Sequence, residues 1–136
     1  MQMNFKLYQG KRVAYLKNHE YKTDQLFRLF STRSARYYVD YIGNVYRQDK
    51  KSRKMTKMTT SKSTPRRKRP SVKIHVNGAT RRFYIDTLMA RAIFPSLIEI
   101  KPSKVGHFDG DQSNNDISNI YYDMTPDLVD EVVKRI

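Results

Sequence analysis

SVKIHVNGATRRFYI, residues 71–85, is the stretch with the clearest local structural signal in this chain. Apolar and polar residues alternate around Asn77 and Gly78, a dipeptide that favours the type I′ turn of a β-hairpin. The stretch therefore predicts two antiparallel strands joined by a two-residue turn. Arg81 and Arg82 are adjacent in the second strand, so at least one of their guanidinium groups should lie on an outward face.

The segment after this hairpin, TLMARAIF at residues 87–94, has the apolar spacing of a short helix. We expect Asp86 to cap the helix, because a carboxylate there can accept hydrogen bonds from the first-turn N–H groups. The helix should end before Pro95, since proline disfavours a helical residue before it. Its core-facing stripe consists of Leu88, Met89, Ala92 and Ile93.

A second hairpin is expected between Tyr37 and Arg47. The strand-like segments RYYVDY and NVYRQ flank a turn at Ile42 and Gly43, and their Tyr and Val residues suit a half-buried pleated surface. We expect the hairpins at 37–47 and 71–85 to form one antiparallel sheet.

The first 35 residues are expected to form an N-terminal extension to the main domain at 36–136. NFKLYQGKRVAYL predicts a short hairpin around Gln9 and Gly10. TDQLFRLF, residues 23–30, predicts a helix capped by Thr23 or Asp24. Its apolar residues exceed one narrow stripe, so this helix should be buried against the domain or a partner subunit. They are Leu26, Phe27, Leu29 and Phe30.

Residues 50–70, KKSRKMTKMTTSKSTPRRKRP, are polar and cationic, with almost no large apolar side chains. Such a segment contributes little to a core, which predicts a mobile basic loop with a short strand around residues 55–60. Candidate contacts to nucleic-acid phosphates in this loop and the following hairpin are Lys54, Lys57, Arg66, Arg67, Lys68, Arg69, Arg81 and Arg82.

The 136-residue chain carries 27 Lys and Arg against 13 Asp and Glu, a formal net charge of +14. Like charges at this density repel one another in the folded state, which points to a polyanionic partner, nucleic acid first. An anionic membrane is a poorer fit, because the basic residues do not follow one face of a helix. The absence of cysteine excludes disulfides, Cys-ligated zinc and thiol catalysis, and fits a reducing cytoplasm. Without a membrane-length apolar run or a signal-like N-terminus, we expect a soluble cytoplasmic protein.

The C-terminal stretch GHFDGDQSNNDISNIYYDMTPD, residues 106–127, resembles the core of phage-type HNH homing endonucleases. YYVDYIGNVYR and RFYIDTLMARAIFP resemble the module that precedes that core, in the same order. The resemblance implies that the chain ends in a ββα metal-binding unit. Together with the hairpins and short helices expected above, this predicts an α+β fold. Thr125 and Pro126, a hydroxyl cap followed by proline at the first helical position, predict the start of the C-terminal helix. A bacterial host cell would be the setting of such a protein.

The resemblance also implies roles for four side chains. His107 matches the general base, and Asn119 matches the residue that braces the loop and orients that base. Asn114 and Asn115 match the paired asparagines of the intervening turn. In this family one divalent ion, Mg²⁺ or Mn²⁺, contacts the scissile phosphate while a neutral imidazole removes a proton from water.

Both metal-ligand positions depart from the family pattern. Gly106 has no side chain, and Leu128 belongs to the apolar stripe of the expected C-terminal helix. Asp109, Asp123 or Asp127 could replace the missing ligands in principle, although Asp127 is turned about 100° around the helix from the usual position. We therefore expect no bound cofactor unless cleavage is retained.

Our leading hypothesis is a DNA-binding protein on a degenerate HNH scaffold, with a regulatory or interference role in a phage or mobile element. DNA is favoured over RNA. The first alternative is an active Mg²⁺- or Mn²⁺-dependent HNH endonuclease that uses His107. The second is an inhibitor or adaptor whose basic face binds an acidic protein, with the apolar helices expected near Leu26 and Val132 mediating assembly, including assembly with a second copy of the chain.

Overall fold

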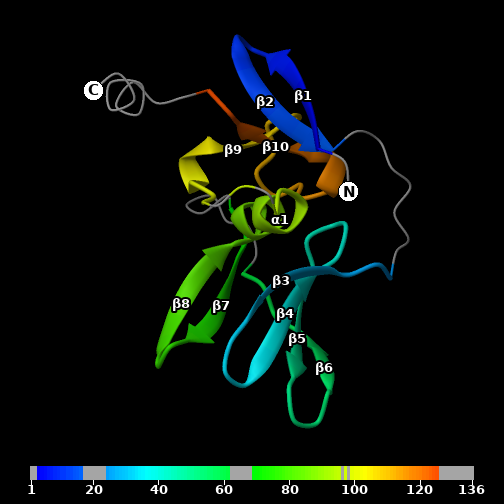
Figure 1. Cartoon of the computed structure of the whole chain (residues 1–136), viewed down its shortest axis with the longest axis vertical. Helices are drawn as coiled ribbons and strands as arrows, with labels where there is room; N and C mark the ends of the chain where they lie inside the picture. The colour runs from blue at the N-terminus through cyan, green and yellow to red at the C-terminus, as the bar shows by residue number, and fades with distance from the viewer. Residues whose placement is uncertain (1–2, 17–23, 62–68, 96, 98, 126–136) are drawn as a thin grey trace.

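The computed structural model describes residues 3–16, 24–61, 69–95, 97 and 99–125. Within these ranges the chain forms antiparallel strands in three sheets, one α-helix and two short 3-10 helices. Figure 1 shows the helix α1 at the centre, with one sheet above it and two below. This arrangement is of the α+β kind. Among the described residues, no helix has the length and apolarity needed to cross a membrane.

The upper sheet combines the two ends of the described chain. Its strands lie in the order β1-β2-β10-β9, and every neighbouring pair is antiparallel. They span Met3–Tyr8 (β1), Lys11–Leu16 (β2), Val105–His107 (β9) and Ile120–Asp123 (β10). The hairpin predicted around Gln9 and Gly10 is confirmed, because β1 and β2 meet there.

The largest lower sheet contains the hairpin predicted between Tyr37 and Arg47, which is confirmed. Its strand order is β3-β4-β5-β6. The strands span Phe27–Ser31 (β3), Ala35–Val39 (β4), Val45–Asp49 (β5) and Met55–Lys57 (β6).

The helix predicted for residues 23–30 is wrong, because residues 27–31 form β3. Phe27 is buried and pairs with Val39 of β4, while its neighbour Arg28 is exposed. The register then shifts between Arg28 and Ser31, as a β-bulge does. A bulge interrupts the two-residue alternation of a strand, so the apolar run of β3 imitates a helical pattern.

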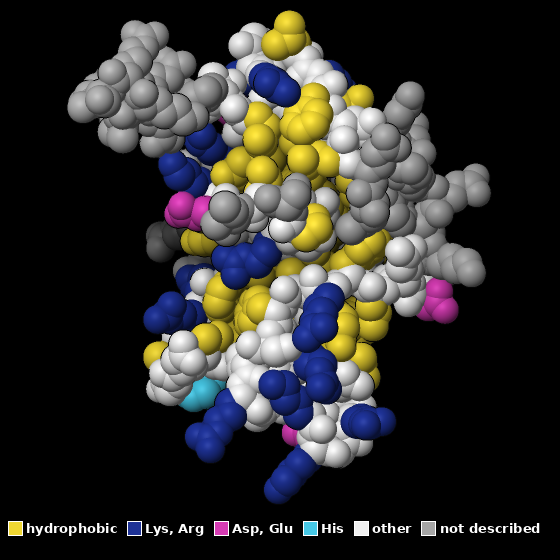
Figure 2. Space-filling model, viewed as in Figure 1, with side chains coloured by type: hydrophobic (Ala, Val, Ile, Leu, Met, Phe, Trp, Pro, Cys, Tyr) yellow, Lys and Arg dark blue, Asp and Glu magenta, His cyan; other side chains and the backbone are white. Residues whose placement is uncertain are grey.

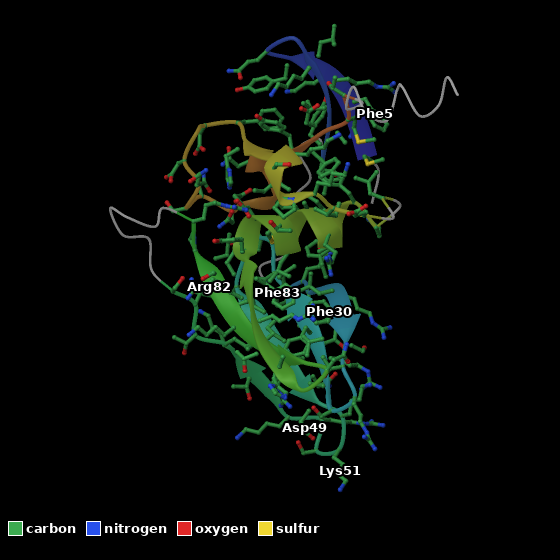
Figure 3. All side chains as sticks on the ribbon, turned by 90° about the vertical axis from the view of Figure 1, so that its left-hand side faces the viewer. Phe5, Phe30, Asp49, Lys51, Arg82 and Phe83 are labelled. Carbon is green, nitrogen blue, oxygen red and sulfur yellow. The ribbon has the colours of Figure 1, made fainter. Side chains whose placement is uncertain are left out.

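The hairpin at residues 71–84 is confirmed. Strand β7 (Ser71–Val76) pairs with β8 (Ala79–Tyr84), and Asn77 and Gly78 both have positive φ, 50° and 79°, as a type I′ turn requires. The prediction of one sheet for both hairpins is wrong, since β7 and β8 form a separate two-stranded sheet. The two sheets pack through aromatic rings, and Figure 3 shows Phe30 of β3 facing Phe83 of β8. These ring centroids are 5.6 Å apart.

Helix α1 (Ile85–Ile93) begins directly after β8. The residue at its N-cap is Tyr84, and Asp86 lies inside the first turn, so the predicted cap at Asp86 is wrong. The predicted apolar stripe is confirmed: Leu88, Met89, Ala92 and Ile93 are all buried. Because α1 contacts strands of both the upper and the lower sheets, its side chains form the centre of the core.

The C-terminal region, where a ββα unit was expected, contains two strands among the described residues. Strands β9 and β10 are antiparallel, and a 3-10 helix, η2 (Ile117–Asn119), precedes β10. Another 3-10 helix, η1 (Pro102–Lys104), precedes β9. The helix expected after Thr125 lies outside the described residues, as do Asp127, Leu128 and Val132.

Candidate functional site

His107 ends β9 and is buried among polar side chains. Its Nε2 lies 3.0 Å from Oδ1 of Asn115 and 3.9 Å from Oδ2 of Asp86, and the His107 and Asp86 side chains are both 4% exposed. This contact engages Nε2 with the side-chain amide of Asn115. The imidazole therefore joins β9 to the following loop and to α1.

Asn115, rather than Asn119, contacts the imidazole. Its position depends on the turn of the β4–β5 hairpin, where Gly43 has a φ of +93°. A Cβ atom on Gly43 would lie 3.0 Å from both Asn115 Cβ and Ile85 Cγ2. Only glycine tolerates this φ together with so close an approach. The turn therefore supports the His107 site from below.

Asn119 and Asn114 brace the loop after His107 through the Asp109 carboxylate. The Asn119 amide donates to Asp109 Oδ1 at 2.9 Å and to the Asn114 carbonyl at 2.9 Å, while its oxygen accepts from the Asp109 N–H at 3.1 Å. The Asn114 amide donates to Asp109 Oδ2 at 2.7 Å. These bonds, that from Asn114 foremost, hold the pKa of Asp109 below its usual value.

Gly106 lies directly under the ring of Tyr121, its partner across β9 and β10. A Cβ atom at Gly106 would be 2.1 Å from Tyr121 Cζ and 2.4 Å from its hydroxyl oxygen. The ring therefore fills the space that any side chain at this position would need. The sequence alone shows that Gly106 lacks a metal ligand, and the structure shows that a side chain at this position would displace the Tyr121 ring.

The Tyr121 ring belongs to an aromatic cluster on the upper sheet, formed by Tyr8, Tyr15, Phe108 and Tyr121. The centroid of the Tyr121 ring lies 4.8 Å from that of Phe108 and 5.3 Å from that of Tyr8. The Lys6 ammonium covers the cluster, 4.4 Å from the Phe108 centroid and 4.6 Å from the Tyr15 centroid. These neighbours hold the Tyr121 ring over Gly106.

The described residues do not fit the divalent ion that the HNH resemblance implies. Mg²⁺ and Mn²⁺ require converging oxygen or nitrogen donors. Gly106 offers none, and both Asp109 carboxylate oxygens already accept hydrogen bonds within the loop. Asp123 accepts a bond from the Thr125 N–H and pairs with Lys11. Across the part of the chain that the structure describes, no three His, Cys, Asp or Glu side chains are grouped to hold a metal.

Arg69, one of the expected phosphate contacts, forms a bidentate ion pair with Asp86. Its Nε donates to Asp86 Oδ2 at 2.9 Å and its Nη2 to Oδ1 at 2.7 Å. The guanidinium also stacks 4.0 Å from the centroid of Tyr84. The hydrogen bond with Asp86 raises the pKa of Arg69. This ion pair neutralises the buried Asp86 carboxylate beside His107, a role that the sequence analysis assigned to neither residue.

The exposed basic residues gather on the lower two sheets, here called the cationic lobe (residues 24–61 and 69–84). Figure 2 shows Lys and Arg side chains spread over this half of the molecule. The candidates Arg66, Arg67 and Lys68 lie outside the described residues. The exposed cations of the lobe include four sequence candidates and six further residues: Lys54, Lys57, Arg81, Arg82, Arg28, Arg33, Lys50, Lys51, Arg53 and Lys73.

Few acidic side chains oppose this charge. The acidic residues in these ranges are Asp24, Asp40 and Asp49. Asp40 is buried in its own turn, where it accepts bonds from the Asn44 backbone and side chain and from the Tyr46 hydroxyl. The six additional cations were not selected from the sequence, although Lys50, Lys51 and Arg53 lie within the basic run at 50–70, because charge alone does not show which side chains stay exposed.

Comparisons with protein-family models, curated proteins and solved structures found no match to this chain.

Proposed function

We propose that the protein binds duplex DNA through the cationic lobe, by contacts to the phosphate backbone, and that it does so without metal-dependent cleavage. The excess of exposed cations on the lobe is the observation that carries this proposal. The HNH-like sequence pattern favours DNA over other polyanions and a phage or mobile-element setting.

The β7–β8 hairpin illustrates why the lobe requires an anionic partner. Lys73 and Arg82 are directly opposite one another across the two strands and are both exposed. Like charges at directly opposite positions destabilise a sheet. The hairpin sequence, residues 71–84, contains no acidic residue to relieve that repulsion. A phosphate between the two cations would turn an unfavourable pair into a binding contact.

The fit around Gly106 supports binding rather than cleavage. The Tyr121 ring occupies the space into which a side chain at position 106 would extend. Nε2 of His107 is engaged by Asn115. A nuclease that required either group would have to rearrange the aromatic cluster and the loop together.

The test is the salt dependence of binding to a duplex. Each phosphate contact contributes a slope of about −0.9 in a plot of log K against log salt concentration. Arg81 and Arg82 point to opposite faces of β8, so replacing both by Ala should remove at least one phosphate contact and reduce the slope by at least about 0.9. The matched control replaces Lys11 and Arg12, a neighbouring cationic pair in the β1–β2 hairpin at the other end of the molecule, and should leave the slope unchanged. A flat salt response of the wild type would refute the proposal.

A second assay distinguishes binding from the nuclease alternative. Supercoiled plasmid is incubated with wild type or His107→Ala, in Mg²⁺ and in Mn²⁺. We expect intact plasmid with both proteins. Metal-dependent nicking by the wild type that disappears in His107→Ala would establish the nuclease alternative instead. The adaptor alternative would be favoured by binding to an acidic protein together with no measurable affinity for DNA.

A further inference from the structure

We propose that a groove at the far end of the cationic lobe is the site that holds a segment of DNA phosphate backbone. The groove has a volume of about 870 Å³ and lies among three turns: residues 32–34, residues 49–51 and the tip of the β7–β8 hairpin. Figure 3 shows Asp49 and Lys51 at this end, remote from α1. The inference rests on the proposed DNA binding, but it assigns the contact to a particular place.

The groove is lined by three exposed cations that are not among the phosphate contacts expected from the sequence. They are Arg33, Lys50 and Lys51. Arg33 belongs to the turn at residues 32–34, and Lys50 and Lys51 belong to the turn at residues 49–51. The cations therefore lie on two walls of the groove rather than along one strand. Thr32 and Ser34 add hydroxyl groups to the same lining. Cations combined with small hydroxyl donors are the side chains that contact DNA phosphates most often.

Two of the three walls of the groove are held together by backbone hydrogen bonds. The Lys50 N–H donates to the Ser34 carbonyl at 3.0 Å, which ties the β3–β4 turn to the β5–β6 turn. Within the first of these turns, the Thr32 N–H donates to the Ala35 carbonyl at 2.8 Å. A site held in place before binding loses less conformational entropy when its ligand arrives.

Asp49 is the one acidic residue in the lining, and its charge is directed into its own turn. Its Oδ1 accepts bonds from the Lys51 N–H at 2.9 Å and the Ser52 N–H at 2.8 Å. Its Oδ2 lies 3.9 Å from Arg47 Nη1. The backbone bond from Ser52 is the main cause of a lowered Asp49 pKa. Asp49 thus orders the turn that carries Lys50 and Lys51.

The third wall contributes polar groups without an opposing charge. It consists of His75, Asn77 and Gly78, which are all exposed. The groove volume falls within the range of about 300–1,000 Å³ typical of ligand pockets, so more than a single ion fits. A length of sugar-phosphate backbone matches both this size and the several cations around it.

The first test compares two double variants of the full chain in duplex DNA binding. Lys50→Ala/Lys51→Ala should lower affinity about 30-fold at 0.15 M salt, the effect of losing two counterion-releasing contacts, and reduce the salt slope by about 1.8. The control Lys11→Ala/Arg12→Ala removes the same charge at the opposite end and should bind as the wild type does. An equal loss in both variants would overturn the groove and leave DNA binding itself intact.

The second test fills the groove without altering its charge. Ser34→Trp should weaken duplex binding at least tenfold, whereas Ser103→Trp, on the exposed 3-10 helix η1 outside the lobe, should not. Circular dichroism and thermal unfolding establish that both variants fold. Undiminished binding by folded Ser34→Trp would overturn the inference.

Competition identifies the source of the phosphate. Unlabelled duplex should displace a fluorescent duplex more effectively than the same strand alone, tripolyphosphate or polyglutamate. Displacement by polyglutamate as effective as that by duplex would assign the groove to acidic protein and overturn the inference. A wild type that binds no duplex would refute the proposed function itself, a result separate from any failure of the groove variants.

Discussion

Gly106→Ala tests the packing that leaves no room for a metal ligand. The added Cβ would lie 2.1 Å from Tyr121 Cζ, whereas ordinary contact begins near 3.4 Å. The ring must therefore move by more than an ångström against Phe108 and Tyr8, which pack on it. Overpacking of this kind costs roughly 1–3 kcal/mol. Replacing glycine in a strand by alanine stabilises it by about 0.5–1 kcal/mol, so the net destabilisation should be on the order of 1 kcal/mol and at most about 2.5 kcal/mol.

The assay is a double-mutant cycle followed by urea unfolding of wild type, Gly106→Ala, Tyr121→Ala and the double variant. Once Tyr121 is truncated the clash disappears, and Gly106→Ala should stabilise the protein by about 0.5–1 kcal/mol. The coupling energy between the two sites should then be about 1–3 kcal/mol. The same effect of Gly106→Ala in both backgrounds would refute the reasoning. Gly106→Asp should unfold still more easily, and Mn²⁺ should not raise its melting temperature.

Three further predictions concern the polar groups near His107. Arg69→Ala should lower the free energy of unfolding, measured in urea, by about 3 kcal/mol, because it leaves the Asp86 carboxylate unpaired. The salt slope of DNA binding should be unchanged. A lower slope at unchanged stability would instead make Arg69 a phosphate contact. Asn114→Ala should raise the pKa of Asp109 in an NMR titration. Because the native pKa of Asp109 is lowered, this carboxylate stabilises the fold above the unfolded pKa of about 3.9, and that stabilisation is lost as pH falls through the native pKa. The free energy of unfolding of Asn114→Ala should therefore fall less on acidification than that of the wild type. An unmoved Asp109 pKa would contradict the assignment. His107→Ala should lower stability by about 1–3 kcal/mol and keep DNA affinity, whereas a loss of affinity in the folded variant would place His107 at the DNA contact.

The hairpins were predictable because their signals are local. Asn77 and Gly78 specify their turn by backbone preference alone, and the strands on either side need only pair with each other. Strand β3 was not predictable in this way. Phe27 and Phe30 gain their partners from β4 and β8, more than ten residues away, and the bulge between Arg28 and Ser31 conceals the strand period.

In the candidate site, too, some features follow from local sequence and others depend on contacts between distant segments. A missing ligand at Gly106 is visible in the sequence, but the ring above it depends on the register of β9 with β10, which pairs Gly106 with Tyr121. Asn115 and Asn119 look alike in the sequence as polar loop residues. Only the folded loop directs one amide to His107 and the other to Asp109, because each orientation depends on contacts with distant segments.

The net charge of +14 and, through local turn signals, most of the hairpins can be read directly from the amino-acid sequence. Which cations remain available to a partner depends on the folded chain. Arg69 pairs with the buried Asp86, whereas Lys50 and Lys51 stand exposed at the groove. Net charge is a sum over residues, but the availability of each charge depends on burial and on pairing between segments remote in the chain.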